Sequence, residues 1–357
     1  MRTEPPLRMP RLYPLRRPGV VAALGAALLF GAGTPLAKLL LDSASPWMLA
    51  GLLYLGPGLG LALLRRVRRA APVRLPAGEW RWLVGAVLAG GVVGPVLLLL
   101  GLTRMPASGA SLLLNAEGVF TALLAWFVFR ENFDRRIALG MLAIVAGAVL
   151  LSWPGEARFS NAWPALCVLG ACLAWGIDNN LTRKVSLADA TWIAAVKGLA
   201  AGSVNFGLAL LLGAEIPVAP VLLGAMLLGL LAYGISLTLF VVALRHLGTA
   251  RTGAYFSVAP FFGTLLGITL LGEALSMRLL AAGALMAFGV WLHLTERHQH
   301  LHAHEPVEHE HEHEHDEHHQ HEGDGSVPAE PHAHRHRHEV LTHEHEHFPD
   351  AHHRHEH

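Results

Sequence analysis

Charge is scarce in this sequence, and so is cysteine. Only 15% of the 357 residues are charged, whereas a typical soluble domain has roughly 25%. The two cysteines, Cys167 and Cys172, fall in one apolar run, and their spacing fits neither a redox pair nor a zinc knuckle. The composition therefore argues against an ordinary soluble domain, and we expect both cysteines to be small core residues of a helix.

Signatures of soluble enzymes are also missing. The sequence contains no Walker loop, no dinucleotide-binding glycine motif and no HExxH pair. The missing Walker loop argues against a primary ATP-driven pump within this chain, and no nucleophile–base pair falls within an apolar run. We therefore expect no enzyme activity, no required cofactor and no nucleic-acid partner.

Long apolar runs, in contrast, fill most of the chain. A helix needs about 20 mainly apolar residues to cross the hydrocarbon core of a bilayer, and ten such runs follow one another with short links. We therefore predict an all-α polytopic membrane protein with ten transmembrane helices. The predicted spans are 19–41, 46–64, 80–103, 107–129, 136–153, 161–182, 188–212, 218–243, 249–272 and 277–295.

Basic residues mark alternate ends of the predicted spans. The ends in between carry at most a lone arginine. Because loops rich in lysine and arginine stay on the cytoplasmic side, we expect both termini to be cytoplasmic, in an inner membrane of the bacterial type. Besides the N-terminal segment, the basic ends include Arg65, Arg66, Arg130, Arg183 and Arg245.

The apolar part of the chain repeats itself. A shift of 142 residues places Glu131 on Glu273, and it also places Gly147 on Gly289. Each copy would hold five helices, and because five is odd, the second copy would enter the membrane from the opposite side. Such inverted repeats are typical of transporters with a central binding site.

The chain therefore divides into four predicted parts. They are a basic cytoplasmic N-terminus (1–18), a first five-helix repeat (19–153), a second five-helix repeat (161–296) and a cytoplasmic tail (297–357).

Polar residues inside the predicted spans are candidate site residues, because placing them in lipid is costly. The strongest candidate for binding a substrate or a proton is Glu117, which lies about midway along the fourth span. The full set is Glu117 and Asn115 in the fourth span, Asp178 and Asn179 in the sixth, Lys197 in the seventh and Lys38 in the first.

Structural explanations stay open for these residues. Glu117 can instead be a buried partner of Lys197, and Asp178 can belong to a solvated helix end beside Arg183. Lys38 and Lys197 can extend toward the membrane interface. The asparagines are more often hydrogen-bonding groups between helices than ligands.

Two motifs occur once in each copy. An aromatic–glycine pair opens both copies, as Phe30-Gly31 and as Trp175-Gly176. A run of small residues then leads to a glutamate, over 107–131 in the first copy and over 249–273 in the second. Across about residues 18–296, the chain thereby resembles the drug/metabolite transporter superfamily, EamA type.

This resemblance implies a secondary exporter or exchanger of small metabolites, with substrates that vary among family members. One position departs from the family pattern. Members usually have a proline before the phenylalanine of the fourth helix of the repeat unit. The second copy has Pro260 at this place, whereas the first copy has Glu117-Gly118. An acidic group at this point is compatible with proton coupling or with a cationic substrate.

The C-terminal tail has a different composition. Residues 298–357 hold 22 of the 24 histidines. They carry 15 acidic and 3 basic residues, a formal charge of −12. Residues 1–297 carry 12 acidic and 24 basic residues, a formal charge of +12, so the two parts cancel. Because the tail has almost no apolar residues to form a core, we predict that it is disordered.

Histidine patterns in the tail predict metal binding. Imidazole is a common ligand of zinc and nickel, and one histidine pattern occurs twice, at an offset of 34 residues. We predict a divalent metal ion, zinc or nickel, although a solvated tail that merely buffers metal stays open. The candidate ligands are His309, His311, His313, His318, His319, His321, His343, His345, His347, His352, His353 and His355.

Together these features predict a secondary transporter that exports a small metabolite or drug-like compound, with a metal-binding tail as regulator or buffer. Its partners would be the small-molecule substrate, the lipid bilayer and divalent metal ions, and a homodimer stays open. The alternative is a transporter of divalent metal ions (zinc, nickel or cobalt), although the spans offer few metal ligands. A third alternative is a metal-sensing or scaffold membrane protein that transports no substrate.

Overall fold

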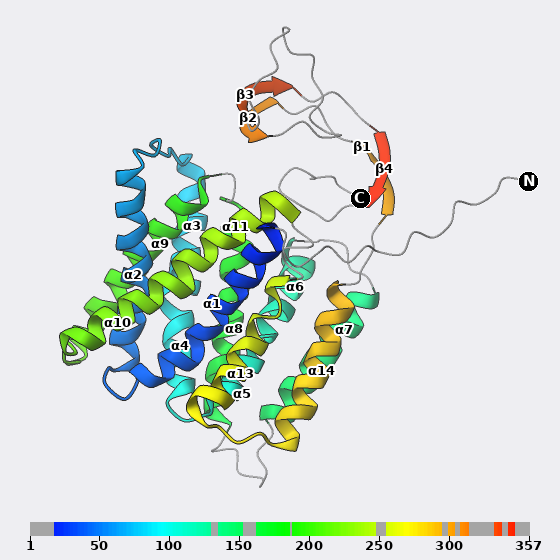
Figure 1. The fold of residues 1–357 in the computed structure, drawn as a ribbon. Coiled ribbons are helices and arrows are strands. Elements are labelled where there is room, and N and C mark those ends of the chain that lie inside the picture. The colour runs from blue at the N-terminus through cyan, green and yellow to red at the C-terminus, as the bar shows by residue number, and fades with distance from the viewer. Residues whose placement is uncertain are drawn as a thin grey trace, which may run out of the picture. The chain divides into compact units, whose positions relative to one another are not determined.

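The computed structural model describes most of the apolar part of the chain and four short segments of the tail. Two compact units divide the chain, Met1–Glu296 and Arg297–His357, and each is described by itself (Figure 1). The described residues are 18–129, 135–152, 162–185, 188–247, 255–294, 299–303, 308–313, 332–337 and 342–346.

The described residues of the first unit form helices joined by short links, and each α-helix overlaps a predicted apolar run. In the first copy the elements are α1 (Pro18–Leu40), α2 (Pro46–Val67), η1 (Ala77–Glu79), α3 (Trp80–Ala86), η2 (Val87–Val93), α4 (Gly94–Leu102), α5 (Ala107–Leu113), α6 (Ala116–Phe129) and α7 (Arg135–Ser152). In the second copy they are α8 (Trp163–Arg183), α9 (Ala190–Leu211), α10 (Ala219–Gly229), η4 (Leu230–Ile235), α11 (Ser236–Leu247), α13 (Ala259–Leu271) and α14 (Met277–Leu294).

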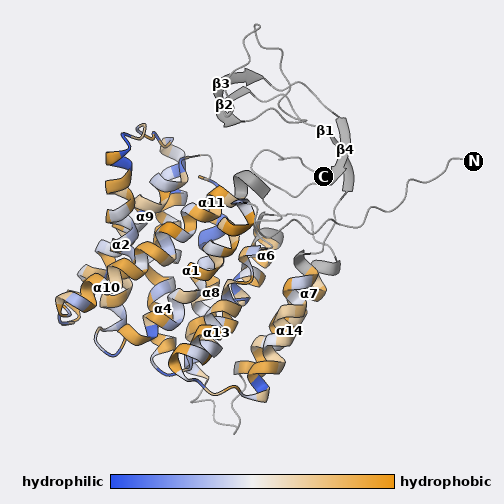
Figure 2. Cartoon of the chain, viewed as in Figure 1, coloured by the Kyte–Doolittle hydropathy of each residue, from blue (hydrophilic) through white to orange (hydrophobic). Residues whose placement is uncertain are grey.

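This unit is a multi-pass membrane protein. Six helical segments of the described residues are long and apolar enough to cross a bilayer, and three shorter apolar helices accompany them. Figure 2 shows apolar residues along the length of the helices. Such extensive exposed apolar surface is suited to lipid. Large apolar side chains that are exposed on the helices include Leu63, Phe127, Leu211, Leu223 and Met277.

Two helices contain a π-helical segment at matching positions of the two copies. The segments are η2 and η4, and the 142-residue shift places residues 88–93 on 230–235. A second interruption lies between α5 and α6, and a turn at 257–258 precedes α13 at the matching place. The duplication seen in the sequence therefore extends to local irregularities of the helices.

The two copies pack against each other reciprocally. Matching helices contact each other, α2 with α9 and α7 with α14. In addition, α1 packs on α11 and α13 of the other copy, just as α8 packs on α4 and α6. Figure 1 shows α7 and α14 lying side by side. These exchanged contacts are those expected when two related units share one core.

Glycines allow the closest helix contacts. A Cβ atom on Gly198 of α9 would lie 2.6 Å from the backbone nitrogen of Gly58 in α2, and one on Gly202 would lie 2.7 Å from that of Leu55. Small residues at such crossings let helix backbones touch in a membrane. The α2–α9 contact is therefore a backbone-to-backbone contact that a larger side chain would separate.

The aromatic–glycine pairs have the same physical explanation. A Cβ atom on Gly31 of α1 would overlap the carbonyl oxygen of Ala259 in α13. In the other copy, a Cβ atom on Gly176 of α8 would lie 3.1 Å from the backbone nitrogen of Thr121 in α6. The glycine of each pair therefore allows one copy to cross an interrupted helix of the other.

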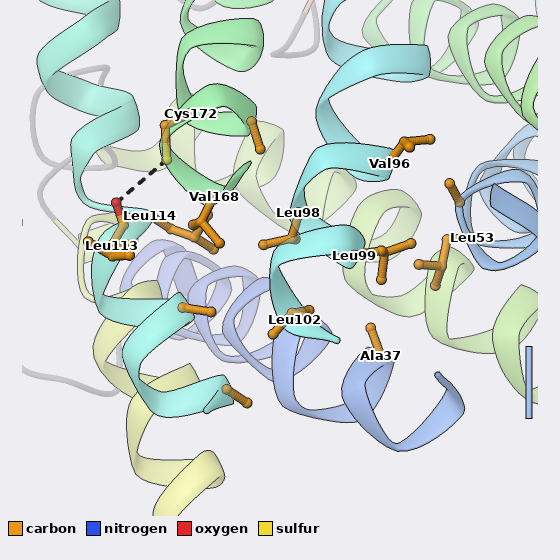
Figure 3. Packing of buried hydrophobic residues seen from close by; sticks show 14 of the residues in the cluster. Ala37, Leu53, Val96, Leu98, Leu99, Leu102, Leu113, Leu114, Val168 and Cys172 are labelled. Carbon is orange, nitrogen blue, oxygen red and sulfur yellow. Dashed lines mark hydrogen bonds between the residues drawn. The ribbon is translucent and has the colours of Figure 1, made fainter. Parts of the chain in front are cut away.

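Buried apolar side chains fill the space between these helices. Figure 3 shows side chains of α4, such as Leu99 and Leu102, packing toward Leu53 of α2 and Ala37 of α1. Cys172 belongs to the same cluster, and its thiol lies 3.5 Å from the carbonyl oxygen of Leu113. Both cysteines are free and buried, as core residues of a helix would be.

The described residues of the tail include four short strands. Strands β1 (Gln299–Ala303), β2 (Glu308–His313), β3 (His332–Arg337) and β4 (Thr342–Glu346) form two antiparallel pairs, β1 with β4 and β2 with β3. The reason is that alternating residues match the two-residue period of a strand, and strand pairing satisfies backbone groups without an apolar core.

The α2–α9 contact yields a prediction. We expect Gly198→Leu to destabilise the protein by about 1–3 kcal/mol, as overpacking of a tight contact does, which thermal unfolding in detergent would measure. Gly207→Leu on the same helix is the control, because nothing lies within 4 Å of a Cβ atom there. Equal unfolding temperatures for the two variants would contradict this account of the contact.

Candidate functional site

A carboxylate of the first copy and an amide of the second meet inside the helical unit. Glu117 lies in the first turn of α6, and Asn179 lies on α8. The Asn179 Nδ2 atom donates to Glu117 Oε1 at 2.9 Å and to the Thr121 hydroxyl oxygen at 3.2 Å. Asn179 is exposed and Glu117 is partly exposed. Two polar side chains on apolar helices thus bond to each other across the two copies.

An ion pair lies directly beside this contact. Lys197 of α9 donates to both carboxylate oxygens of Asp178, at 2.5 and 2.7 Å, and Thr182 donates to the same carboxylate at 2.8 Å. The Asp178 residue is 6% exposed. The structure thus pairs Lys197 with Asp178 and not with Glu117. It also buries Asp178, so the interpretation of this residue as part of a solvated helix end is wrong.

The π-helical segment η2 forms one side of this region. A π-turn moves carbonyls out of the regular helical hydrogen-bond ladder, and three side chains bind those carbonyls. The Tyr54 hydroxyl and the Trp175 indole donate to the Gly90 carbonyl at 2.7 and 2.9 Å. The Asn205 amide donates to the Gly91 carbonyl at 3.0 Å. Side chains of α2, α8 and α9 therefore hold this interruption in place.

Aromatic rings extend the region to the second π-segment. The rings of Tyr54 and Tyr233 stack at 5.7 Å, and Phe30 meets Tyr233 edge-on at 5.9 Å. Both copies therefore supply rings to this aromatic cluster, Phe30 and Tyr54 from the first and Tyr233 from the second.

Two other predicted site residues have structural contacts instead. Asn115 is 7% exposed and donates to the Leu112 carbonyl at 2.9 Å, at the interruption between α5 and α6. The Lys38 ammonium donates to the carbonyls of Leu102 and Met105, at 2.7 and 2.5 Å, at the end of α4. Of the six predicted residues, the structure therefore groups Glu117, Asn179, Asp178 and Lys197, and it places these two elsewhere.

Glu273 stabilises the start of α5. Its two carboxylate oxygens accept from the backbone N–H groups of Ala107 and Ser108, at 2.6 and 2.8 Å. A carboxylate is favourable there because the first N–H groups of a helix lack partners. Its counterpart in the repeat, Glu131, lies outside the described residues. Glu273, which follows α13 and ends the second copy of the motif, thus connects the end of α13 to the start of α5.

Sequence reasoning missed the two tyrosines and Thr121. The chain has four tyrosines, and three of them, Tyr54, Tyr233 and Tyr255, lie inside predicted apolar runs. A phenolic hydroxyl in such a run needs a hydrogen-bond partner, so this placement was the signal that could have found them. Thr121 gave no signal, because a threonine one turn beyond Glu117 also fits an ordinary helix.

The predicted metal ligands divide into two groups. Within the described helices, no three His, Cys, Asp or Glu side chains gather closely enough to hold a metal ion. His309, His311, His313, His343 and His345 lie on strands of the tail. Seven candidates lie outside the described residues, namely His318, His319, His321, His347, His352, His353 and His355.

The start of α9, the helix that carries Lys197, is fixed by Asp189. This carboxylate accepts from the Trp192 N–H at 3.0 Å and lies 2.7 Å from the Arg65 guanidinium of α2. Burial acts to raise its pKa, but hydrogen bonds from Thr191, Arg65 and the Trp192 N–H outweigh burial and lower the pKa to about 2. The carboxylate is therefore charged at neutral pH and caps α9.

Comparisons with known proteins agree with this architecture. The EamA-like transporter family matches residues 17–153 and 162–295. An uncharacterized transporter of Methanothermobacter thermautotrophicus is 28% identical over 303 residues, which cover 78% of this chain and 87% of that protein. The uncharacterized inner membrane transporter YedA of Escherichia coli strain K12 is 25% identical over 248 residues, covering 66% of this chain and 77% of YedA.

Two further similarities are more limited. A probable 4-amino-4-deoxy-L-arabinose-phosphoundecaprenol flippase subunit ArnE of Pseudomonas fluorescens is 41% identical over 73 residues, or 20% of this chain and 61% of that protein. A solved crystal structure has a TM-score of 0.58 at 20% identity, covering 76% of this chain and 94% of the solved chain. The latter similarity concerns the fold alone.

The Asp189 cap yields a second prediction. We expect Asp189→Ala to lower the free energy of unfolding by about 1 kcal/mol, as loss of an N-cap does, with less loss for Asp189→Asn, which keeps a capping oxygen. Because the folded pKa is about 2 against an ordinary 3.8, the charged cap contributes fully above pH 4 and is lost toward pH 2. Equal free energies of unfolding at pH 7 for wild type and Asp189→Ala would refute the role of Asp189 as a cap.

The buried ion pair yields a third prediction. Lys197→Met leaves the Asp178 carboxylate buried without its partner, so we expect a loss of about 3–5 kcal/mol. The double variant Asp178→Asn/Lys197→Met removes both charges and should recover much of that loss. Thermal unfolding of the wild type, both single variants and the double variant measures the coupling. Additive losses would show that the pair is not coupled.

Proposed function

This chain belongs to the EamA-like transporter family, and from that premise we propose that it is a secondary transporter which exports a small organic compound across an inner membrane. The proposal includes ten transmembrane helices, arranged as two inverted repeats with both termini in the cytoplasm. It is supported by the reciprocal packing of the two copies and by the basic residues at alternate span ends.

The observation that carries the proposal is the contact between Glu117 and Asn179. It joins the two copies, as expected of a central site that alternating access of related repeats exposes to either side. A carboxylate within a membrane helix marks a substrate or proton site. The partial exposure of Glu117 also supports access of a solute or a proton to its carboxylate.

The chemistry near Glu117 favours a cationic substrate with an apolar part. The carboxylate attracts a protonated amine, and the faces of Tyr54 and Tyr233 attract cations through their ring electrons. Because one carboxylate binds either the amine or a proton, proton entry on one side can release the substrate on the other. Glu117 would thus couple export of an organic cation to proton import.

The neighbouring groups make transport of a divalent metal ion the weaker alternative. Two carboxylates lie in this region, but Asp178 is occupied by Lys197 and Thr182. Among the described residues of this region, Glu117 is then the remaining carboxylate, whereas zinc sites use three or four protein ligands. We therefore assign zinc, nickel or cobalt to the tail and not to the membrane path.

The tail would bind divalent metal as a regulator or a buffer. Its histidines are numerous, and imidazole is a good ligand for zinc and nickel. The interspersed glutamates add negative charge that attracts cations. In this proposal, the tail binds metal either to regulate transport or to store the metal. The organic substrate passes through the helices without metal.

The site yields a fourth prediction, on flux. In proteoliposomes with an imposed pH gradient, we expect wild type to move the organic cation ethidium, and Glu117→Gln to reduce this flux to that of protein-free vesicles. Glu215→Gln is the control, since Glu215 is exposed in a link between helices. Undiminished flux in Glu117→Gln would remove Glu117 from the mechanism. Flux of zinc but of no organic cation in a test panel would favour the metal-ion alternative.

A further inference from the structure

Two opposite charges hold the turn between α4 and α5. From the end of α1, the Lys38 ammonium donates to the carbonyls of Leu102 and Met105, at 2.7 and 2.5 Å. The Glu273 carboxylate, which follows α13, accepts from the first two N–H groups of α5, at 2.6 and 2.8 Å. The cation belongs to the first copy and the anion to the second. The turn is therefore attached to both copies at this end of the helical unit.

These contacts lie at one end of four helices. Helices α1, α4 and α13 end here, at Leu40, Leu102 and Leu271, and α5 begins here at Ala107. In the proposed topology, with both termini in the cytoplasm, the first span ends and the fourth span begins on the opposite side of the membrane. We therefore call this end the outer end.

Burial changes along the fourth span at the candidate site. Every residue of α5 is buried, and so are residues 114–116. Most residues of 117–124 are instead partly exposed, and a Cβ atom on Gly118 would have nothing within 4 Å. The span is thus closely packed between the outer end and Glu117. A solute can reach Glu117 from the outer end only if α5 separates from its neighbours.

The contact between α5 and α13 contains a buried hydroxyl that has no partner among the described residues. This group is the Ser111 Oγ atom, and a Cβ atom on Gly263 would lie 2.5 Å from it. A buried hydroxyl without a hydrogen bond is unfavourable, and water would bind it if the helices separated. The Thr264 hydroxyl donates across the same contact to the Ser108 carbonyl at 3.1 Å. Additional bonds are therefore needed to keep α5 against α13.

From these contacts we propose that Lys38 and Glu273 form a latch that keeps the outer end closed. Both side chains release the turn between α4 and α5 when Glu117 becomes accessible from outside. The inference rests on the proposed function, because alternating access requires each end to open in turn. Hydrogen bonds to charged groups are stronger than those between neutral groups. The four bonds of the latch therefore offset the unfavourable burial of the Ser111 hydroxyl.

The experiment measures how fast a cysteine at position 111 reacts with a membrane-impermeant maleimide. Ser111→Cys is combined with Cys167→Ala and Cys172→Ala, which remove the native thiols. The reagent is added to spheroplasts, where it reaches only the outer side of the inner membrane. We expect Lys38→Met and Glu273→Ala each to raise the labelling rate about tenfold or more. The rate follows the open fraction, and a hydrogen bond to a charged group contributes about such a factor.

Matched variants at the outer end control for the loss of a charge. Arg104 and Glu215 are exposed in links between helices, so Arg104→Met and Glu215→Ala should be labelled as slowly as the parent. Glu273→Gln keeps one oxygen that can accept a hydrogen bond but loses the charge, so its rate should lie between those of the parent and Glu273→Ala. Equal labelling in the test and control variants would overturn the latch.

General loosening of the fold has a different result. Ala209 is fully buried on α9, which packs on α2. A cysteine at this position, in the same background, should stay unlabelled in Lys38→Met and in Glu273→Ala. Labelling of positions 111 and 209 to the same extent would mean that these variants unfold the helical unit, and it would overturn the latch.

Failure of the transport proposal can be distinguished from failure of the latch. If the wild type moves no organic cation but the test variants expose position 111, the latch stands and the proposed substrate is wrong. If the wild type moves ethidium but the labelling rate is unchanged in both test variants, the transporter stands and the latch is wrong.

Discussion

The constraint on which this structure depends is that backbone polar groups within a bilayer cannot bond to water. Each group must find a partner inside the protein, so an apolar chain folds into helices, and every interruption of a helix requires a substitute partner. Tyr54, Trp175 and Asn205 bind the carbonyls of η2. Lys38 binds the carbonyls at the end of α4, and two oxygens of Glu273 bind the first N–H groups of α5. The polar residues of the spans thus mostly act as replacements for helical hydrogen bonds.

Duplication places these interruptions where two copies meet. The π-segments η2 and η4 fall at matching positions, as do the two breaks before α6 and α13. The copies are not identical in chemistry, however. Glu117-Gly118 stands where the second copy has Ala259-Pro260, and the Asp178–Lys197 pair belongs to the second copy alone. A symmetric frame therefore holds an asymmetric site, with one accessible carboxylate beside an ion pair whose charges already satisfy each other.

The tail follows different physics from the helical unit. It has few apolar residues to bury, so pairing of β1 with β4 and of β2 with β3 depends on backbone hydrogen bonds. In the helical unit, by contrast, glycine contacts such as Gly198 with Gly58 bring the backbones together without any ligand.

The sequence by itself determined the apolar runs, the repeat and the family, and it selected Glu117 and Asn179 as candidates. Hydropathy and internal similarity can be read from the order of residues alone, and lipid requires apolar segments to be helical. It did not determine which polar groups meet. Asp178 pairs with Lys197 across 19 residues, and Glu117 meets Asn179 across 62. Helical periodicity relates only residues within about one or two turns. Contacts between helices depend on how glycine-lined surfaces cross, and the facing of His311 with His334 depends on strand register, so only the tertiary structure decided them.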